Sequence, residues 1–260
     1  IGNPAVIAAG TGIDVVADFR RADIDAGGQG APLVPAFHQA LFARAGEHRV
    51  VLNIGGIANI TILPSDASLP VTGFDTGPGN TLLDAWTRQH LDAPMDTGGR
   101  WAAQGSVHAE LLAGMLQDPY FHAPPPKSTG REYFNPDWLA RYLQDSGIAA
   151  QDVQATLCAL TAQSILDALE HHAPRTQRLL VCGGGIHNPE LLRRLAENQA
   201  GMPVESTQPY GVDPDWVEAV AFAWLAKQHL DGKPGNIPAV TGAQRPVVLG
   251  SRTRASRQIP

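Results

Sequence analysis

A single acid set among glycines is the strongest chemical signal in this sequence. Asp75 lies in the stretch GFDTGPGNTLLDAW, where Gly77, Gly79 and Asn80 precede an apolar helical pattern. Glycines let backbone amides approach an anion closely, and amides at a turn or helix N-terminus supply donors and a favourable dipole for phosphate. Asp75 is therefore a candidate to handle a proton or orient a nucleophile beside a phosphate site. The alternative is that Asp75 only caps the following helix, as Asp often does.

A second glycine turn precedes this one, in the stretch VVLNIGGIANITIL. Its apolar, β-branched residues predict a hairpin over residues 50–63 with Gly55 and Gly56 at the turn. Asn53 and Asn59 flank that turn. The hairpin is thus a second place where backbone amides could reach a phosphate.

A third glycine run, VCGGGIHN, follows a buried apolar strand and precedes a helix. It holds Gly183, Gly184 and Gly185 and ends at Asn188. The spacing is not GxGxxG with a later acid, so a dinucleotide site is not indicated. The run favours a glycine platform under an adenine or ribose. The alternative is a tight connection between strand and helix, which would need fewer glycines.

Polar residues also follow the predicted strand over residues 13–19. Arg20 and Asp23 come after it, and a glycine loop containing Gly28 and Gln29 follows them. Ligands of open α/β sheets bind outside such strand ends, so these residues are candidate ligand contacts. The alternative is a surface turn with exposed ion pairs.

Two further candidates for contact with a substrate come later in the chain. Lys127 and Arg131 lie in KSTGREYF, directly after a rigid run of prolines, and could anchor an anionic group or belong to a lid. A solvated connection explains them equally well. Glu218 lies in the first turns of an apolar helix and faces either solvent or the site.

The elements that must position these residues alternate between strands and helices, which predicts an α/β fold. The expected strands are 13–19, the hairpin 50–63, 179–182, a short strand at the start of MPVESTQPYG and an edge strand over 247–250. The expected helices are 1–12, one with Pro35 in its first turn, 81–90, a two-helix insert after residue 95, two over 136–173, one at Pro189, and one from Asp213 or Pro214 with Val217, Val220, Ala221 and Trp224 facing inward.

Composition narrows the classes of partner. Charged residues make up 17% of the 260 residues, and the formal charge is 19 − 25 = −6, so no basic surface favours nucleic acid or an anionic membrane. Cys158 and Cys182 show no metal or disulfide spacing. No apolar run approaches the roughly 18 to 20 residues of a membrane span, and no leader is evident. We expect a cytoplasmic protein with a small-molecule ligand.

Several well-known catalytic motifs do not occur in this sequence. We find no P-loop, protein-kinase signature set, GxSxG elbow or HExxH helix. What remains is a set of glycine turns at strand ends with one acid at the middle turn. That distribution suits a nucleotide held in a cleft between two α/β domains.

Seven strings in order give the chain a specific resemblance to a known family. They are DFRRADIDAGGQGAPLVPAFH, VLNIGGIANIT, GFDTGPGNTLLDAW, PPPKSTGREYFN, DVQATLCALTAQSI, LLVCGGGIHNPELL and EAVAFAWLA. Over essentially its whole length the sequence resembles the anhydro-N-acetylmuramic acid kinases. The resemblance implies an actin-like ATPase (ribonuclease H-like) fold, with two α/β domains around an ATP cleft.

The resemblance also implies a reaction. ATP and Mg²⁺ would be used to open the anhydro bridge of 1,6-anhydro-N-acetylmuramic acid with water and to phosphorylate the oxygen released, giving N-acetylmuramic acid 6-phosphate for peptidoglycan recycling. The family's catalytic acid falls on Asp75, with an expected role as general base for water. No metal site of the chain's own is expected apart from Mg²⁺ with ATP.

The resemblance sorts the other candidates into two groups. The expected nucleotide-binding residues are Asn53, Gly55, Gly56, Asn59, Gly77, Gly79, Asn80, Gly183, Gly184, Gly185 and Asn188. The expected substrate-binding residues are Arg20, Asp23, Gly28, Gln29, Lys127, Arg131 and Glu218. An arginine among them could hold the lactyl carboxylate of the sugar through two hydrogen bonds.

One departure from the family pattern affects the expected domains. The family's first phosphate motif, of the DGTSxDG kind, does not occur, and roughly one hundred residues of a usual two-domain length are missing. We therefore expect residues 1–50 to be the remnant of an N-terminal domain with a sugar-side loop. Residues 51–260 are expected to form the C-terminal ATPase-type domain, with a helical insert at about 92–145. The isolated chain should be nearly inactive, because phosphoryl transfer depends on positioning.

Two other classes of function stay open on the sequence alone. A non-catalytic sensor of sugar or nucleotide on the same fold would explain the missing phosphate motif. An interaction domain using the helices over 136–173, with a homodimer as one assembly, is the third class.

Overall fold

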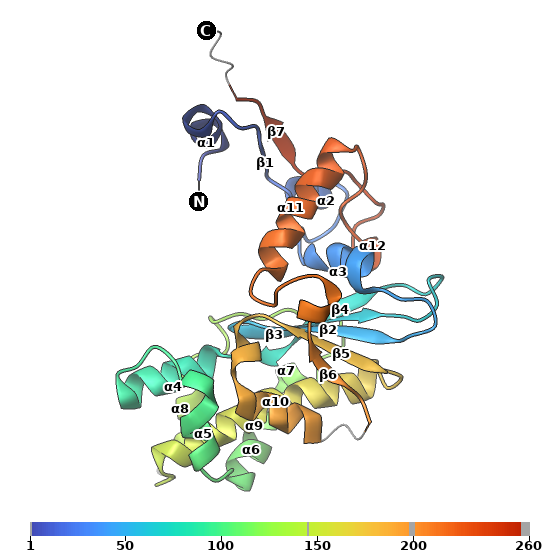
Figure 1. Cartoon of the computed structure of the whole chain (residues 1–260). Coiled ribbons are helices and arrows are strands. Elements are labelled where there is room, and N and C mark those ends of the chain that lie inside the picture. The colour runs from blue at the N-terminus through green and yellow to red at the C-terminus, as the bar shows by residue number, and fades with distance from the viewer. Residues whose placement is uncertain (1, 145, 198–200, 256–260) are drawn as a thin grey trace. The chain divides into compact units, whose positions relative to one another are not determined.

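The computed structural model describes residues 2–144, 146–197 and 201–255, which form two compact units (Figure 1). Unit 1 comprises residues 1–41, 70–72 and 218–260, and unit 2 comprises residues 42–69 and 73–217. This division differs from the boundary expected at residue 50. The last part of the chain groups with the N-terminal segment because helix α11 (Val217–Leu230) and the residues after it pack there.

Unit 2 is built on a five-stranded sheet with the order β4-β3-β2-β5-β6. Strands β2 (Arg49–Ile54) and β3 (Ile57–Leu63) form the predicted hairpin, in which Leu52 lies opposite Ile60. The other strands are β4 (Thr72–Pro78), β5 (Arg178–Cys182) and β6 (Val204–Ser206). Both β2 and β3 are mostly apolar and mostly buried, which explains why their pattern could be recognised in the sequence.

Strand directions identify the fold class. Strand β3 runs antiparallel to β2, whereas β5 runs parallel to β2 and β6 runs parallel to β5. This order and these directions are those of the ribonuclease H-like core on which actin-like ATPase domains are built. The predicted α/β fold class is therefore confirmed.

One long helix, α9 (Ala150–His172), fills the middle of unit 2. Fifteen of its residues are buried, and it contacts α4 (Thr81–Leu91), α5 (Arg100–Gln104), α6 (Ala109–Leu116) and α10 (Pro189–Glu197). These helices lie on one face of the sheet (Figure 1). Helix α9 is buried on nearly all sides. Small alanine and threonine residues lie between its large apolar side chains, so neighbouring elements can pack closely around it.

The predicted helical insert contains more elements than expected. Within residues 92–145 it holds η1 (Thr97–Gly99), α5, α6, α7 (Pro119–His122) and α8 (Pro136–Leu143). Asp118 joins these short helices, because its carboxylate accepts hydrogen bonds from the side chains of Tyr133 (2.7 Å) and Trp138 (2.8 Å). A short 3₁₀ helix, η2 (Gly184–His187), connects β5 to α10, and η3 (Gln208–Tyr210) follows β6.

Unit 1 consists of short elements. They are α1 (Pro4–Thr11), β1 (Val15–Ala17), α2 (Arg21–Asp25), α3 (Val34–Phe42), α12 (Pro238–Thr241) and β7 (Ser251–Thr253), together with most of α11. Leu33, Leu225 and Leu249 form a small core, and β1 pairs with β7 in an antiparallel two-stranded sheet. Across the described residues of both units, no helix is long and apolar enough to span a membrane.

Several predicted elements in unit 1 need correction. The strand expected over 13–19 is only three residues long and half-buried, because it pairs with a single short strand at the molecular surface. The edge strand lies at Ser251–Thr253 rather than 247–250. Helix α11 begins at Val217 rather than at 213 or 214, and Val220 on it is 38% exposed instead of facing inward.

Candidate functional site

Asp75 lies in the middle of strand β4 and not in a turn. Its Oδ2 accepts hydrogen bonds from Ser128 Oγ (3.0 Å) and from the backbone N–H of Thr129 (2.9 Å). The side chain therefore does not cap α4, which excludes the helix-capping alternative. The N-cap position of α4 is Asn80, which makes no side-chain capping bond.

The environment of Asp75 makes it a better proton acceptor than an ordinary aspartate. Burial raises the pKa of its carboxyl, and the hydrogen bonds from Thr129 and Ser128 oppose that rise without cancelling it. The side chain is half-buried rather than sealed, so a ligand can still reach it. A carboxylate with a raised pKa near an open surface fits the predicted role of a base.

The loop that holds Asp75 is tied down on both sides. The amide of Asp75 donates to the carbonyl of Lys127 (3.2 Å), and Tyr120 Oη donates to the carbonyl of Asp75 (2.7 Å). Lys127 Nζ in turn donates to the carbonyls of Tyr120 (3.0 Å) and Phe121 (3.1 Å), and it lies 4.8 Å from the centre of the Tyr120 ring. Its ammonium therefore faces the end of α7, and burial lowers its pKa. The contacts of Lys127 favour a bracing role over the predicted anion anchor.

The glycine turns after β2 and after β4 pack against each other. The amides of Gly79, Asn80 and Thr81 donate to the carbonyls of Gly55 and Gly56 at 2.8 to 3.0 Å. The amides that the sequence offered to a phosphate at the start of α4 are thus engaged within the protein. The glycines are required by close approach, because a Cβ on Gly79 would lie 2.4 Å from the carbonyl oxygen of Gly55. A Cβ on Gly77 would likewise lie 2.7 Å from the ring of Phe121.

The outer side of the hairpin turn carries a positive charge. A Cβ built on Gly56 would lie 3.2 Å from two guanidinium nitrogens of Arg131 and 3.2 Å from Thr81 Oγ1. Arg131 is exposed. Burial raises the pKa of the nearby Asp84 carboxyl, and the positive charges of Arg88 and Arg131 partly oppose that rise. Arg131 therefore lies over the predicted phosphate hairpin.

The third glycine run has one half-buried member, Gly183, one exposed member, Gly184, and one buried member, Gly185. A Cβ on Gly183 would lie 2.4 Å from Asn53 Oδ1, and one on Gly185 would lie 2.4 Å from Ile54 Cγ2, so both glycines allow the run to pack on the end of β2. Gly184 is exposed, and a Cβ there would meet nothing within 4 Å. This open backbone is where a flat ligand face could rest.

Asparagines border the glycine turns. Asn53 and Asn59 lie directly opposite each other in the β2–β3 hairpin, and both are partly exposed. The Asn80 side chain donates to the carbonyl of Ile54 (3.3 Å). Asn188 is buried, and its Oδ1 accepts from the amide of Leu191 (3.1 Å), so its side chain holds the start of α10.

The candidates in unit 1 surround one buried acid. Asp23 is 0% exposed, and its carboxylate accepts from Thr241 Oγ1 (2.7 Å), Asn236 Nδ2 (2.6 Å) and the amide of Gly30 (2.8 Å). A Cβ on Gly28 would lie 2.2 Å from Asp23 Oδ2. Asp23 therefore holds the glycine loop in place and is fully occupied by protein groups.

The three remaining candidates of unit 1 are exposed. Arg20 Nε donates to the carbonyl of Gly30 (2.9 Å), and the amide of Gln29 donates to the carbonyl of Thr241 (2.8 Å). Glu218 lies at the start of α11 with its side chain in solvent. These residues stay predicted substrate contacts.

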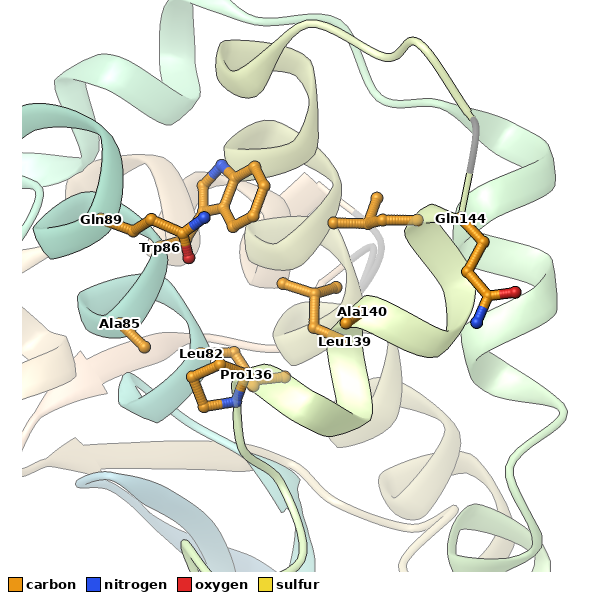
Figure 2. A pocket seen from close by; sticks show the side chains of 9 residues that line it. Leu82, Ala85, Trp86, Gln89, Pro136, Leu139, Ala140 and Gln144 are labelled. Atoms are coloured by element: carbon orange, nitrogen blue, oxygen red, sulfur yellow. The ribbon is translucent and has the colours of Figure 1, made fainter.

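Two further features of the described residues concern ion binding and cavities. Within the described ranges, no three His, Cys, Asp or Glu side chains gather as ion ligands. A pocket of about 300 Å³ opens between α4 and α8 and is lined mainly by apolar side chains, as Figure 2 shows. Its lining residues are Leu82, Ala85, Trp86, Gln89, Pro136, Leu139, Ala140, Leu143 and Gln144, none of them a predicted site residue.

Sequence reasoning missed three residues around Asp75. Ser128 and Thr129 supply its hydrogen bonds, and Tyr120 holds its carbonyl. The string PPPKSTGREYFN singled out the right loop but suggested its charged residues instead of the serine and threonine between them. A short hydroxyl residue in a loop carries no signal of its own until the loop is seen beside an acid.

Comparison with known proteins identifies the family. A family model described as anhydro-N-acetylmuramic acid kinase matches residues 1–255. The chain belongs to the anhydro-N-acetylmuramic acid kinase family. Proteins of that name from Xylella fastidiosa, Xanthomonas axonopodis pv. citri and Coxiella burnetii are 53%, 54% and 52% identical to it over 251 residues.

The kinase relatives are longer than this chain. Each of these alignments covers 96% of the present sequence but only 65%, 67% and 68% of the respective relative. The chain therefore spans about two thirds of the length of the curated relatives it matches. Strand β4 with Asp75, the hairpin and the glycine run all fall inside the matched region.

Two of the solved structures that match this chain are much less similar to it than these kinases are. An activator of 2-hydroxyisocaproyl-CoA dehydratase from Clostridium difficile with bound ADPNP aligns over 75% of this chain and 67% of its own, with 12% identity and a TM-score of 0.41. An ethanolamine utilization protein from Carboxydothermus hydrogenoformans aligns over 70% and 50%, with 14% identity and a TM-score of 0.34.

Proposed function

We propose that this chain provides the catalytic acid and part of the ATP site of a kinase that acts on 1,6-anhydro-N-acetylmuramic acid. Membership of the family supports this proposal. The observation that carries it is the half-buried carboxylate of Asp75, which has a raised pKa and is held by a loop from outside its own strand. Because the chain spans about two thirds of its relatives, the activity is assigned to a protein of their full length.

The proposed reaction uses water, the anhydro sugar and ATP. Asp75 takes a proton from water while the water oxygen forms a bond to the anomeric carbon, and the bond from that carbon to the bridging oxygen breaks. The released oxygen bonds to the γ-phosphorus of ATP, and the bond from that phosphorus to ADP breaks. The products are N-acetylmuramic acid 6-phosphate, ADP and the proton that Asp75 later returns to solvent. This chemistry belongs to the recycling of peptidoglycan.

We place the phosphates of ATP, as part of this proposal, at the outer side of the β2–β3 turn. Gly56, Thr81 Oγ1 and the exposed Arg131 border that surface, and an arginine suits a phosphate because its planar donors match the oxygens. The open backbone at Gly184 is the proposed rest for the nucleoside. Mg²⁺ would accompany the phosphates of ATP.

The setting of the reaction is also a proposal. The two cysteines are free and buried, as is usual for a protein of a reducing compartment, and the formal charge of −6 disfavours nucleic acid. We therefore place the protein in the cytoplasm with the sugar and ATP as its partners. A homodimer stays a prediction.

The test is a direct assay of the 260-residue chain and of the product of the complete coding sequence. With ATP, Mg²⁺ and the anhydro sugar, phosphorus NMR and mass spectrometry should detect a sugar phosphate heavier than the substrate by one water and one phosphoryl group. Asp75→Asn should lower turnover by roughly 10²- to 10⁴-fold, the usual contribution of a general base. Turnover within about tenfold of wild type would contradict that role. Calorimetric binding of both ligands with no transfer would favour the non-catalytic sensor instead.

A further inference from the structure

We propose that Ser128 and the backbone amide of Thr129 position the Asp75 carboxylate, holding Oδ2 so that Oδ1 is the oxygen that takes the proton. This inference rests on the proposed function and adds positioning residues to it. Both donors come from one loop and both reach the same oxygen, at 3.0 and 2.9 Å. Oδ1 accepts no hydrogen bond from the described residues, so it is the oxygen left to a water or a substrate hydroxyl.

Two donors on one oxygen fix the direction of a carboxylate. A single hydrogen bond leaves the group free to turn about its last side-chain bond, whereas a second donor on the same oxygen restricts that rotation. The productive geometry of a base must be held within a narrow range, because small displacements cost large factors in rate. Oδ2 is thus committed to the loop, and Oδ1 is presented to the reacting proton.

The loop can act in this way because it is itself anchored. Lys127 Nζ donates hydrogen bonds to the carbonyls of Tyr120 and Phe121, and the carbonyl of Lys127 accepts one from the amide of Asp75. Tyr120 Oη holds the carbonyl of Asp75 at 2.7 Å. Strand and loop are therefore tied through the backbone, which keeps the two donors aimed at Oδ2.

The same hydrogen bonds restrain the basicity of Asp75. Both stabilise the ionised carboxylate, while burial raises the pKa of Asp75. Removing the Ser128 hydroxyl leaves burial opposed by the Thr129 amide alone. The acid limb of the rate profile should then move to higher pH, because a larger fraction of the base is protonated at any given acidic pH.

Three variants test the proposal, with rate and titration as separate readouts. The rates are measured on the product of the complete coding sequence. In it we expect Ser128→Ala to lower kcat about tenfold, the factor expected for one hydrogen bond to a charged group, and to leave KM for ATP unchanged. Its acid limb should lie at higher pH than that of wild type. Ser128→Thr keeps the hydroxyl and should restore both values. Ser106→Ala, which removes an exposed hydroxyl elsewhere in unit 2, is the matched control.

The titration of Asp75 can be measured without turnover. Carbon-13 NMR of labelled aspartate in the 260-residue chain, with the Asp75 signal assigned through Asp75→Asn, should show a higher pKa in Ser128→Ala than in wild type or Ser128→Thr. An unchanged pKa in Ser128→Ala would overturn the proposal. If Asp75→Asn stays active, the proposed general base fails. If Asp75→Asn is inactive while Ser128→Ala keeps wild-type kcat and pH profile, only the positioning inference fails.

Discussion

Replacing Gly79 by alanine tests whether the glycine turns serve close packing. An added Cβ would lie 2.4 Å from the carbonyl oxygen of Gly55 and 3.1 Å from the carbonyl carbon of Ile57. Both contacts are backbone atoms, so the hairpin must move away from the start of α4, since no side chain can rotate to make room. Overpacking of this kind costs about 1–3 kcal/mol of stability.

Movement of the hairpin would also weaken the hydrogen bonds between the two turns. The amides of Gly79, Asn80 and Thr81 donate across this junction at 2.8 to 3.0 Å, and each such bond contributes about 0.5–1.5 kcal/mol. With one or two of them lost, Gly79→Ala should lower the free energy of unfolding by about 2–4 kcal/mol. For a unit of this size the melting temperature should fall by roughly 5–15 °C.

Urea unfolding followed by tryptophan fluorescence measures this loss, and hydrogen exchange localises it. The amides at positions 80 and 81 should exchange faster in Gly79→Ala than in wild type. Gly184→Ala is the matched control, because its Cβ would meet nothing within 4 Å, and its stability should stay within about 0.5 kcal/mol of wild type. The packing explanation is wrong if Gly79→Ala is as stable as wild type, or if both variants lose stability equally.

Two further predictions concern unit 1. Asp23→Ala should lower the free energy of unfolding in urea by about 3–5 kcal/mol, because three buried donors lose their acceptor. The control, Asp25→Ala, breaks an exposed pair with Arg21 and should cost less than about 1 kcal/mol. Equal losses in the two variants would contradict this prediction. Burial lowers the pKa of His38 from 6.5 to about 3, so its contribution to stability is complete above pH 6.5 and is lost as the pH falls toward 3. Urea unfolding at several pH values between 3 and 6.5 gives the slope of the unfolding free energy against pH. His38→Gln should reduce that slope by up to about 1.4 kcal/mol per pH unit, and an unchanged slope would refute the prediction.

The fold was predictable where one physical signal dominated. Most buried positions of the hairpin Arg49–Leu63 and of helix α9 carry apolar residues, so their patterns matched the structure closely. Strand β4 was read as a turn because GFDTGPG contains three glycines and a proline. Gly77 and Gly79 allow close approach to neighbouring segments, and the strand pairing stays intact, which a local pattern cannot reveal.

The candidate site was predictable only in part, for a related reason. Asp75 was identified from its own surroundings in the sequence. Its partners Ser128 and Thr129 lie 53 and 54 residues away, and their selection depends on how the loop docks on β4. Asp23 was predicted from its sequence surroundings to contact the substrate. Its carboxylate instead accepts hydrogen bonds from Asn236 and Thr241, which lie far along the chain and which no local pattern could indicate.

The stretch from Gly73 to Thr81 therefore contains two structurally distinct parts. As far as Pro78 it is a strand that presents the Asp75 carboxylate, and after Pro78 it is a turn whose amides are engaged with the β2–β3 hairpin. A phosphate cannot use amides that already donate to Gly55 and Gly56 without breaking those bonds. The proposed phosphate contacts must then come from the outer side of the hairpin, where Arg131 lies over Gly56. The base and the groups that hold the phosphates would thus be neighbouring but separate, so Asp75→Asn should stop the attack of water, and with it the phosphorylation of the sugar, without disturbing the groups that hold ATP.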